Sequence, residues 1–337
     1  MEHRRDLPWR HTKDPYRIWL SEVILQQTRV DQGRAYWERF VAKWPTVQAL
    51  AAASEAEVLK LWQGLGYYSR ARNLLAGARQ VVQEHYGHFP NTHAGLLKLK
   101  GVGDYTAAAI ASICFGRPDA VLDGNVFRVL ARVFGISTPI DSTEGRKRFR
   151  ALAQELIDPA NPGDHNQALM ELGATVCTPR NQTCLLCPLQ PQCAAFATGT
   201  IARLPVKAGT VKVRTRHFNY LHIRTDTGLY MHQRTGKDIW QGLWEPPLLE
   251  TEGAVDAAGL RKALKKACLD GRWTISHPNG PVKHVLSHQV IQAVFWEVSP
   301  PSGWKAPADW RPADHARLRK LAVPRLVERW LVEQGGA

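Results

Sequence analysis

The feature of this sequence that most constrains its fold is a series of amphipathic helical segments that runs from residue 15 to residue 196. Asp14 and Pro15 are typical of a helix start, an N-cap followed by proline at the first helical position. Apolar residues then recur with a helical period as far as Trp44. Further helical segments, separated by short turns that carry Gly or Pro, are expected at 54–64, 69–86, 92–100, 104–115, 124–134, 143–157 and 164–176. Helices without strands predict a compact all-helical domain.

A dense group of cysteines follows the last of these helices. Four of the six cysteines in the chain lie within one short segment, with the spacing C-x6-C-x2-C-x5-C: Cys177, Cys184, Cys187 and Cys193. Zinc sites usually contain two C-x2-C pairs, and this segment has one. A 4Fe–4S cluster also takes four thiolates and suits one short spacing with two longer ones. The spacing therefore favours one 4Fe–4S cluster, with zinc as the alternative, and a disulfide framework is disfavoured without a signal peptide.

The character of the chain changes after Cys193. Residues 199–216 are basic, are interrupted by Pro and Gly, and show no clear period, so they predict a linker. The following residues predict two strands joined by a turn at 226–228, a helix at 254–268, a strand at 290–298 and a helix at 313–334. Such a mixture predicts a second, α+β domain of about 120 residues.

Charge and hydropathy narrow the range of partners. The chain has 337 residues, with 44 Lys plus Arg against 30 Asp plus Glu, which gives a net charge of +14. An excess of this size indicates an anionic partner, most often nucleic acid, although a merely basic surface is the alternative. No apolar run approaches the roughly 20 residues of a membrane helix, and the N-terminus is polar and basic. We therefore expect a cytoplasmic protein with no membrane span and no secretory signal.

The most specific local motif is the sequence LKLKGVGDYTA at residues 97–107. An apolar helix ends there, Gly101 and Gly103 form a tight hairpin, and a helix of small residues begins. The glycines let backbone N–H groups approach a ligand closely, and the second helix presents an N-terminus that favours phosphate. The motif predicts a helix-hairpin-helix over about residues 92–115, which holds the DNA backbone without reading its sequence. A plain turn between packed helices is the alternative.

Two carboxylic acids occupy contrasting places in the predicted helices. Glu22 has three apolar neighbours within one helical turn: Ile18, Trp19 and Leu25. A carboxyl among such groups loses hydration, so the pKa of Glu22 should rise towards neutrality, whereas the helix N-terminus after Asp123 should keep that carboxylate ionised. Glycosidic cleavage needs such a pair, one to protonate the leaving group and one to stabilise the cationic sugar. A solvated Glu22 and a capping Asp123 are the plainer alternatives.

Two further segments have side chains suited to contact a DNA duplex from which a base has been extruded. The sequence GLGYYSRAR at 64–72 places two tyrosines on a glycine-bounded turn before two arginines, which suits insertion into a duplex and contact with its phosphates. A core tyrosine beside a solvated basic helix is the alternative. Gln27, within the triplet 26–28 one turn after Glu22, could fill the space left by an extruded base, although on its own the triplet means little.

Together these segments resemble the endonuclease III superfamily of DNA glycosylases, and within it the MutY-type adenine DNA glycosylases. The resemblance extends over nearly the whole chain and is carried by LPWR (7–10), LSEVILQQT (20–28), GLGYYSRARNL (64–74), LKGVGDYTAAAI (99–110), LDGNVFRVLAR (122–132), the cysteine segment and LWEPP (243–247). The family removes adenine mispaired with 8-oxoguanine, or guanine, from double-stranded DNA. The resemblance therefore implies base excision repair, one 4Fe–4S cluster, duplex DNA as partner, and a monomeric protein.

The resemblance also assigns roles to individual residues. Glu22 would protonate adenine N7, and Asp123 would stabilise the oxocarbenium ion or trap the sugar, with Tyr105 and Asn125 in support. Tyr67 would be the wedge beside 8-oxoguanine. The positions that would line the adenine pocket are Arg5, Trp9, Arg10, Leu25 and Gln167. The lesion-sensing loop corresponds to Leu286, Ser287 and His288, where the family commonly has Phe-Ser-His.

Two departures from related enzymes refine the prediction. Bifunctional endonuclease III enzymes have a nucleophilic lysine where this chain has Tyr105, so we expect a monofunctional glycosylase with little lyase activity. A hydrolytic Nudix domain has a glutamate-rich helix that holds magnesium, whereas residues 258–269 contain no glutamate. The second domain should therefore bind rather than hydrolyse. The rivals are a pyrimidine-damage glycosylase/lyase, an inactive mismatch-binding protein and a nucleotide hydrolase.

The expected architecture is therefore multidomain. We place an all-α helix-hairpin-helix glycosylase domain at residues 1–198, with the iron–sulfur loop at 177–193. A linker at 199–216 leads to a Nudix-like α+β domain at 217–337 that recognises 8-oxoguanine.

Overall fold

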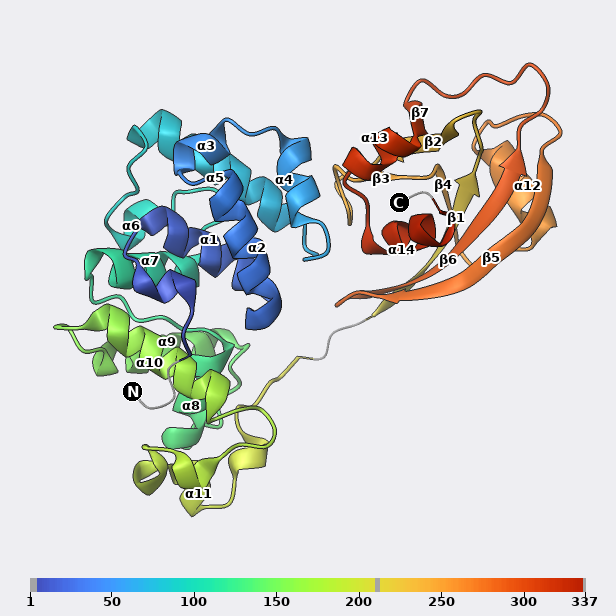
Figure 1. Cartoon of the computed structure of the whole chain (residues 1–337). Coiled ribbons are helices and arrows are strands. Elements are labelled where there is room, and N and C mark those ends of the chain that lie inside the picture. The colour runs from blue at the N-terminus through green and yellow to red at the C-terminus, as the bar shows by residue number, and fades with distance from the viewer. Residues whose placement is uncertain (1–4, 210–212, 336–337) are drawn as a thin grey trace. The chain divides into compact units, whose positions relative to one another are not determined.

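The computed structural model describes residues 5–209 and 213–335 and divides into two compact units (Figure 1). The first unit consists of Met1–Ala53 and Asn73–Thr210, and the second consists of Ser54–Arg72 and Val211–Ala337. Segment 54–72, which the sequence assigns to the helical domain, thus groups with the second unit. Among the described residues, no helix is both long enough and apolar enough to span a membrane.

The helical part of the chain contains all the helices that the sequence predicts. In chain order they are η1 (Pro8–His11), α1 (Pro15–Leu25), α2 (Val30–Lys43), α3 (Val47–Ala51), α4 (Glu55–Trp62), α5 (Ser69–His85), α6 (His93–Leu96), α7 (Asp104–Phe115), α8 (Gly124–Val133), α9 (Thr143–Leu156), α10 (Pro162–Thr175), η2 (Cys184–Leu186), η3 (Gln190–Gln192), α11 (Ala194–Ala197) and η4 (Ile201–Arg203). The bounds of α7 agree with the prediction, and those of α4, α5, α8, α9 and α10 fall within two residues of it. Only α6 is markedly shorter than predicted, because turns replace the helix after Leu96.

The first predicted helix is interrupted. Asp14 caps α1 as expected, its carboxylate accepting a hydrogen bond from the Tyr16 N–H at 2.9 Å. The apolar period continues to Trp44, yet α1 ends at Leu25 because Gln26 turns to an extended ψ and Gln27 adopts a left-handed φ of 55°. The break separates α1 from α2 and leaves Glu22 in the last turn of α1.

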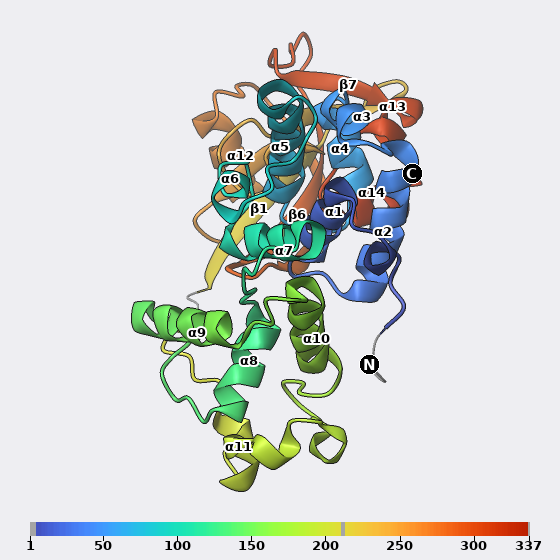
Figure 2. The same cartoon turned by 90° about the vertical axis from the view of Figure 1, so that its left-hand side faces the viewer.

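Close packing around α7 organises the first unit. The segment of α7 from Thr106 to Ser112 is buried on all sides and rich in alanine, which lets α1, α6 and α10 approach it closely. Trp19 of α1 is completely buried in the same unit. Below these helices α8 lies between α9 and α10 (Figure 2). The ends of α1, α7, α8 and α10 are thereby brought together.

Much of the predicted linker is attached to the first unit. Leu204 is buried in the core formed by α7, α8 and α9, and the Ile140 N–H donates to the Val206 carbonyl at 3.0 Å. The Asp141 carboxylate accepts the N–H groups of Ala208 and Gly209, each at 2.9 Å. Residues 210–212 lie outside the described residues, and the first strand begins at Arg214.

The second unit contains two sheets. Its elements after the linker are β1 (Arg214–His222), β2 (Gly228–Gln233), β3 (Trp244–Glu245), β4 (Leu248–Thr251), α12 (Ala257–Lys266), β5 (Thr274–Val285), β6 (Gln289–Ser299), β7 (Trp310–Asp314), α13 (His315–Lys320) and α14 (Arg325–Glu333). The larger sheet has the order β4-β1-β6-β5, in which β1 and β6 run parallel, and the smaller has the order β3-β2-β7. The predicted α+β class and the predicted α12 and β6 are confirmed.

One expectation for this part of the chain is wrong, and one strand is not anticipated. The two strands joined near 226–228 are confirmed as β1 and β2, although they enter different sheets, with the bridge Arg224–Leu229 between them. The helix predicted at 313–334 is two helices, because the chain is extended from Leu321 to Pro324. The long β5 was not predicted, since its prolines at 278 and 281 accompany register shifts that remove a strand-like pattern.

Helices cover both faces of the larger sheet. Successive side chains of a strand point to opposite faces, so Phe295 and Trp296 of β6 pack on different helices. Trp296 belongs to the core that Leu260 and Leu264 of α12 enter. Phe295 stacks on Trp330 of α14, with ring centroids 4.6 Å apart. The sheet is thus an apolar layer between α12 and α14 (Figure 1).

Helix α4 explains why segment 54–72 belongs to the second unit. Gln63 donates from Nε2 to Glu328 Oε1 at 2.8 Å and accepts the Val323 N–H at 3.1 Å. Lys60 Nζ donates to the Leu321 carbonyl at 2.8 Å. These bonds satisfy backbone groups in the extended break between α13 and α14.

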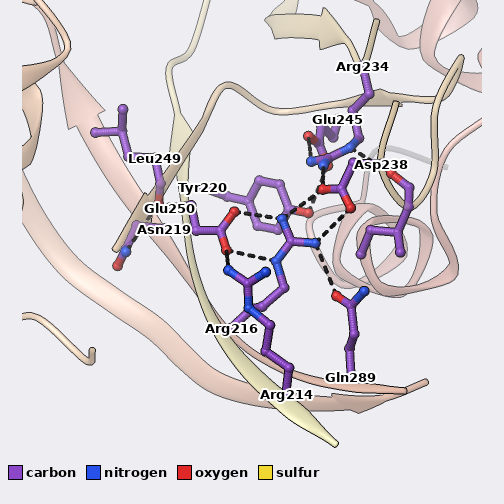
Figure 3. Close-up of polar contacts among 11 residues, drawn as sticks. Arg214, Arg216, Asn219, Tyr220, Arg234, Asp238, Glu245, Leu249, Glu250 and Gln289 are labelled. Atoms are coloured by element: carbon purple, nitrogen blue, oxygen red, sulfur yellow. Dashed lines mark hydrogen bonds and ion pairs between the residues drawn. The ribbon is translucent and has the colours of Figure 1, made fainter. Parts of the chain in front are cut away.

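A buried arginine joins the edge of the larger sheet to the loop after β2 (Figure 3). Arg216 on β1 is 7% exposed and donates to both carboxylate oxygens of Glu250 at 2.6–2.7 Å. It also contacts both oxygens of Asp238 at 2.7–3.0 Å and the Gln289 amide oxygen at 3.0 Å. Arg234 continues the network from Asp238 to the buried Glu245. One guanidinium therefore fixes β4, the loop 234–243 and the start of β6.

We expect Arg216→Met to destabilise the second unit by about 3 kcal/mol, because it removes the buried guanidinium shared by Glu250 and Asp238 and leaves Asp238 with Arg234 alone. Arg214→Met on the same strand is the matched control. Its side chain is 75% exposed and 3.9 Å from Glu250, so the expected cost is below about 0.5 kcal/mol. Hydrogen exchange of peptides from β1 and β4 in the full chain measures both. Equal protection in the two variants would contradict the role given to Arg216.

Candidate active site

A cavity of about 540 Å³, lined by both polar and apolar side chains, lies in the first unit. Its volume is in the range of sites that hold a small ligand. Residues from segment 5–10, α1 and the turn after it, α7, the start of α8, and α10 form its walls. Ten residues predicted from the sequence line it: Arg5, Trp9, Arg10, Glu22, Leu25, Gln27, Tyr105, Asp123, Asn125 and Gln167. Five predicted residues lie elsewhere: Tyr67, Gly101, Gly103, Ser287 and His288.

Glu22 presents a carboxyl to the cavity from the last turn of α1. The side chain is nearly buried, 8% exposed, and Oε2 accepts a hydrogen bond of 2.5 Å from the Tyr105 hydroxyl. Burial raises the pKa of Glu22 to about 7, with Asp123 adding to the rise, while the hydrogen bond from Tyr105 and the charge of Arg10 oppose it. The pKa rise predicted from the apolar neighbours of Glu22 is therefore confirmed.

Tyr105 remains a proton donor in this site. Burial, followed by the nearby charge of Glu22, raises the pKa of Tyr105 well above its ordinary value. Its hydroxyl also lies 3.3 Å from the Met170 sulfur. A neutral phenol at this place can donate a hydrogen bond to Glu22 but supplies no amine nucleophile.

Asp123 is the N-cap of α8. One of its oxygens accepts the N–H groups of Asn125 and Val126 at 2.9 and 2.7 Å, and the other accepts the Asn125 side-chain amide at 2.8 Å. These bonds and Arg128 favour the carboxylate, as expected of a helix N-terminus. Burial outweighs them, however, so the pKa of Asp123 is raised rather than lowered from its ordinary value. The structure thus makes Asp123 both a cap and a wall of the cavity.

Arg128 links this cap to the cysteine segment. Its side chain is buried and donates to Asn125 Oδ1 at 2.7 Å, to the Gly173 carbonyl at 2.7 Å and to the Cys177 carbonyl at 2.7 Å. Close packing reinforces the link, since a Cβ on Gly173 would lie 2.6 Å from the Cβ of Asn125. The orientation of Asn125 is therefore set from both of its amide atoms.

An acidic residue that the sequence did not predict closes one side of the cavity. Glu171 on α10 is 6% exposed and accepts from the Arg5 side chain at 2.8 and 2.7 Å, from the Arg5 backbone N–H at 2.9 Å and from Arg10 at 2.6 Å. Burial acts to raise its pKa, but these hydrogen bonds together lower the pKa of Glu171 to about 2. The available signal was its spacing of four residues from Gln167, which places both on one face of α10.

The predicted hairpin is confirmed around its glycines. Gly101 has a left-handed φ of 79°, and a Cβ there would lie 2.6 Å from the Asn73 Cβ, so glycine is required. Gly103 is the N-cap of α7 and provides no side-chain acceptor for the first N–H groups of that helix. A Cβ on Gly103 would meet nothing within 4 Å. The N-terminus of α7 is thus approachable by an anion.

A second cavity is lined by all four clustered cysteines: Cys177, Cys184, Cys187 and Cys193. The described cysteines form no disulfide. Arg132 is buried and directs Nη1 to the Cys177 sulfur at 3.3 Å. In the described part of the chain, no three His, Cys, Asp or Glu residues are grouped so as to hold a metal ion. Four thiols around one cavity are the donor set that a 4Fe–4S cluster takes, so the residues present fit such a group.

Tyr67 and Ser287 meet in the second unit. Tyr67 has a left-handed φ of 45° and a half-exposed ring, and its hydroxyl hydrogen-bonds to the Ser287 Oγ. Ser287 and His288 are exposed in the turn between β5 and β6, where the Leu286 N–H donates to the Gln289 carbonyl. Two residues predicted from separate motifs are therefore brought into contact.

Comparison with known proteins places these sites in a family. Residues 20–159 match the model of the HhH-GPD superfamily base excision DNA repair proteins, and residues 219–333 match that of the NUDIX domain. The adenine DNA glycosylase of Buchnera aphidicola subsp. Schizaphis graminum is 34% identical over 250 residues, which cover 74% of this chain and 72% of the relative. The chain belongs to the adenine DNA glycosylase family.

Other adenine DNA glycosylases are more similar over shorter stretches. The human enzyme is 52% identical over 203 residues, which cover 58% of this chain and 37% of the relative. The Arabidopsis thaliana enzyme is 38% identical over 302 residues, 78% of this chain and 48% of the relative. The chain thus spans less than half the length of these family members.

Solved structures agree on the fold of the helical part. A thermostable thymine-DNA glycosylase is similar with a TM-score of 0.54 and 32% identity, over 58% of this chain and 90% of that one. A trapped endonuclease III–DNA covalent intermediate is similar with a TM-score of 0.51 and 21% identity, over 59% and 90%, which shows the fold alone. The predicted helix-hairpin-helix glycosylase fold of this adenine DNA glycosylase family member is therefore confirmed.

Proposed function

We propose that this chain is a monofunctional adenine DNA glycosylase, which flips adenine paired with 8-oxoguanine out of duplex DNA and hydrolyses its N-glycosidic bond. The observation that carries the proposal is the pair of carboxyl groups in one cavity. Glu22 is buried with a pKa of about 7, and Asp123 is held by three N–H donors. A base must leave the stack before an acid in such a cavity can reach it.

Glu22 acts as the general acid. Near neutral pH a substantial fraction of a carboxyl with a pKa of about 7 carries its proton. Glu22 gives this proton to N7 of adenine, which turns the base into a neutral leaving group. The Tyr105 hydroxyl holds Oε2 at 2.5 Å and so directs the carboxyl towards the cavity. General acid catalysis of this kind contributes roughly 10²- to 10⁴-fold to the rate.

Asp123 acts on the sugar. As the C–N bond breaks, positive charge develops on the deoxyribose, and a nearby carboxylate stabilises this oxocarbenium-like state or briefly traps it. Asn125 donates to Asp123 Oδ2, and Arg128 fixes Asn125 in turn. Water then completes the hydrolysis at the sugar.

The absence of an amine supports hydrolysis without strand cleavage. None of the described residues that line the cavity is a lysine. Strand cleavage by the lyase route needs an amine that forms a Schiff base with the sugar. Tyr105, at the position of the nucleophilic lysine in bifunctional relatives, has a phenol instead, so the abasic site should be the product.

DNA contact is proposed at the hairpin and in the second unit. The N-terminus of α7 after Gly103 suits a backbone phosphate, and the net charge of +14 favours a polyanion. We assign recognition of 8-oxoguanine to Tyr67, Ser287 and His288, because the first two are in contact and all three side chains are exposed. The 258–269 helix lacks glutamate, so this unit is proposed to bind without hydrolysis.

We also propose that the four cysteines hold one 4Fe–4S cluster. When bound, the cluster cross-links the cysteine segment through four metal–thiolate bonds. Arg132 places its positive charge beside Cys177, and Arg128 ties the Cys177 carbonyl to the capping residues of α8. The cluster segment thereby supports the cavity wall without taking part in the reaction.

The activity is tested by single-turnover reactions on a duplex with one central A:8-oxoguanine pair. Matched A:T and thymine glycol:A duplexes run alongside, each read with and without alkali. We expect alkali-dependent cleavage at the mispaired adenine only. Glu22→Gln should lower the rate at least about 100-fold while DNA affinity is retained, and Glu38→Gln on exposed α2 should change neither. Alkali-independent cleavage at thymine glycol would instead indicate a bifunctional pyrimidine-damage enzyme.

The cofactor is tested by metal analysis of the purified protein. We expect about four irons per chain and broad absorbance near 400 nm, as is typical of a 4Fe–4S cluster. Cys187→Ser should lose both signals, because it removes one thiolate ligand. Cys268→Ser, which changes an exposed cysteine outside the segment, is the matched control and should keep both. Zinc in place of iron would contradict the assignment.

Lesion selectivity is tested with Ser287→Ala combined with His288→Ala. Because these side chains carry the polar groups of the exposed turn, we expect the rate preference for A:8-oxoguanine over A:G to fall by about 10-fold, which corresponds to roughly one lost hydrogen bond. Ser302→Ala with His315→Ala, both exposed in the same unit, is the control. An unchanged preference would mean that this turn is not the lesion sensor.

A further inference from the structure

The Glu171 carboxylate is shared by two arginines at the wall of the active-site cavity. Arg5 and Arg10 both bond to Oε2, at 2.7 and 2.6 Å, and Arg5 bonds to Oε1 as well. Arg10 also donates from Nη1 to the Arg5 carbonyl at 3.0 Å. The three side chains form one cluster with a formal charge of +1, since two cations share a single anion.

This cluster faces the carboxyl of Glu22. The titratable groups around Glu22 are Tyr105 and Cys114 from α7, Asp123 at the start of α8, and the cluster from segment 5–10 and α10. The charge of Arg10 lowers the pKa of Glu22, against the larger effect of burial. Any further positive charge at the cluster would therefore favour the carboxylate, which cannot donate a proton.

We propose that Glu171 is a positioning residue, which holds Arg5 and Arg10 against the cavity wall and offsets their charge so that Glu22 keeps its proton. This inference rests on the proposed role of Glu22 as the general acid. Glu171 does not itself react. Without it, Arg10 would lose a hydrogen-bond acceptor, and the formal charge of the cluster beside the acid would rise from +1 to +2.

The geometry favours this role over a purely structural ion cluster. Glu171 is 6% exposed, and its two arginines also line the cavity that Glu22 faces. The side chains of Arg10 and Glu171 are 10% and 8% exposed, so water screens their charges weakly, and Arg10 is the member of the cluster whose charge acts on Glu22. An ion cluster that contributes only to stability need not lie at the cavity that holds an acid with a pKa of about 7, whereas this cluster does.

The test is the pH dependence of the single-turnover excision rate at saturating protein. In the unchanged protein the rate should fall above about pH 7, as Glu22 loses its proton. Glu171→Gln removes a negative charge, lowers the pKa of Glu22 and should move this fall to lower pH by about one unit. Arg10→Gln removes a positive charge and should move it to higher pH. The double variant should lie between the two.

Glu171→Asp is the matched control, because it keeps the charge with a shorter side chain. It should leave the midpoint of the pH profile within about 0.3 units even if the rate is lower at every pH. A loss of rate in Glu171→Gln that is equal at all pH values would overturn the inference and assign Glu171 a structural role. Full excision by Glu22→Gln would overturn the proposed function instead, so the two failures are distinguishable.

Discussion

The burial of the Glu22 carboxyl is the constraint on which the cavity of the first unit depends, and the proposed role of this residue as an acid rests on it. Glu22 lies in the last turn of α1, where α7 covers it and Tyr105 bonds to it. The break after Leu25 belongs to the same arrangement, since Gln26, Gln27 and Thr28 of the turn line the cavity together with Glu22. Packing around α7 therefore positions this carboxyl as well as the helices.

The two carboxyl groups of the cavity, Glu22 and Asp123, are both buried but receive different hydrogen bonds. Burial raises the pKa of both. Asp123 receives three N–H donors, two of them from the helix that it caps, whereas Glu22 receives one hydroxyl. At Glu22 burial raises the pKa to about 7 against a single hydrogen bond from Tyr105. The number of donors that each carboxyl meets therefore distinguishes two acids that share one cavity.

Local signals in the sequence predicted more than long-range ones. The bounds of α7, the Asp14 cap and the raised pKa of Glu22 depend on neighbours within one turn, and the structure confirms them. The two strands joined at 226–228 also exist, but a turn signal cannot show that the parallel partner of β1 lies some 75 residues later. The roles of the site residues stay predictions, although ten of them line one cavity.

Glu171 shows which kind of site residue the sequence does not reveal. Its partners Arg5 and Arg10 are 166 and 161 residues away in the chain, so no local pattern predicts these ion pairs. A glutamate at this place in an amphipathic helix is predicted to be solvated, and it becomes informative only when the structure shows Glu171 buried with two arginines at one cavity wall. Sequence motifs identified ten residues that line the cavity. The ion pairs of Glu171 come from tertiary contacts, which is why this carboxylate had to be found in the structure.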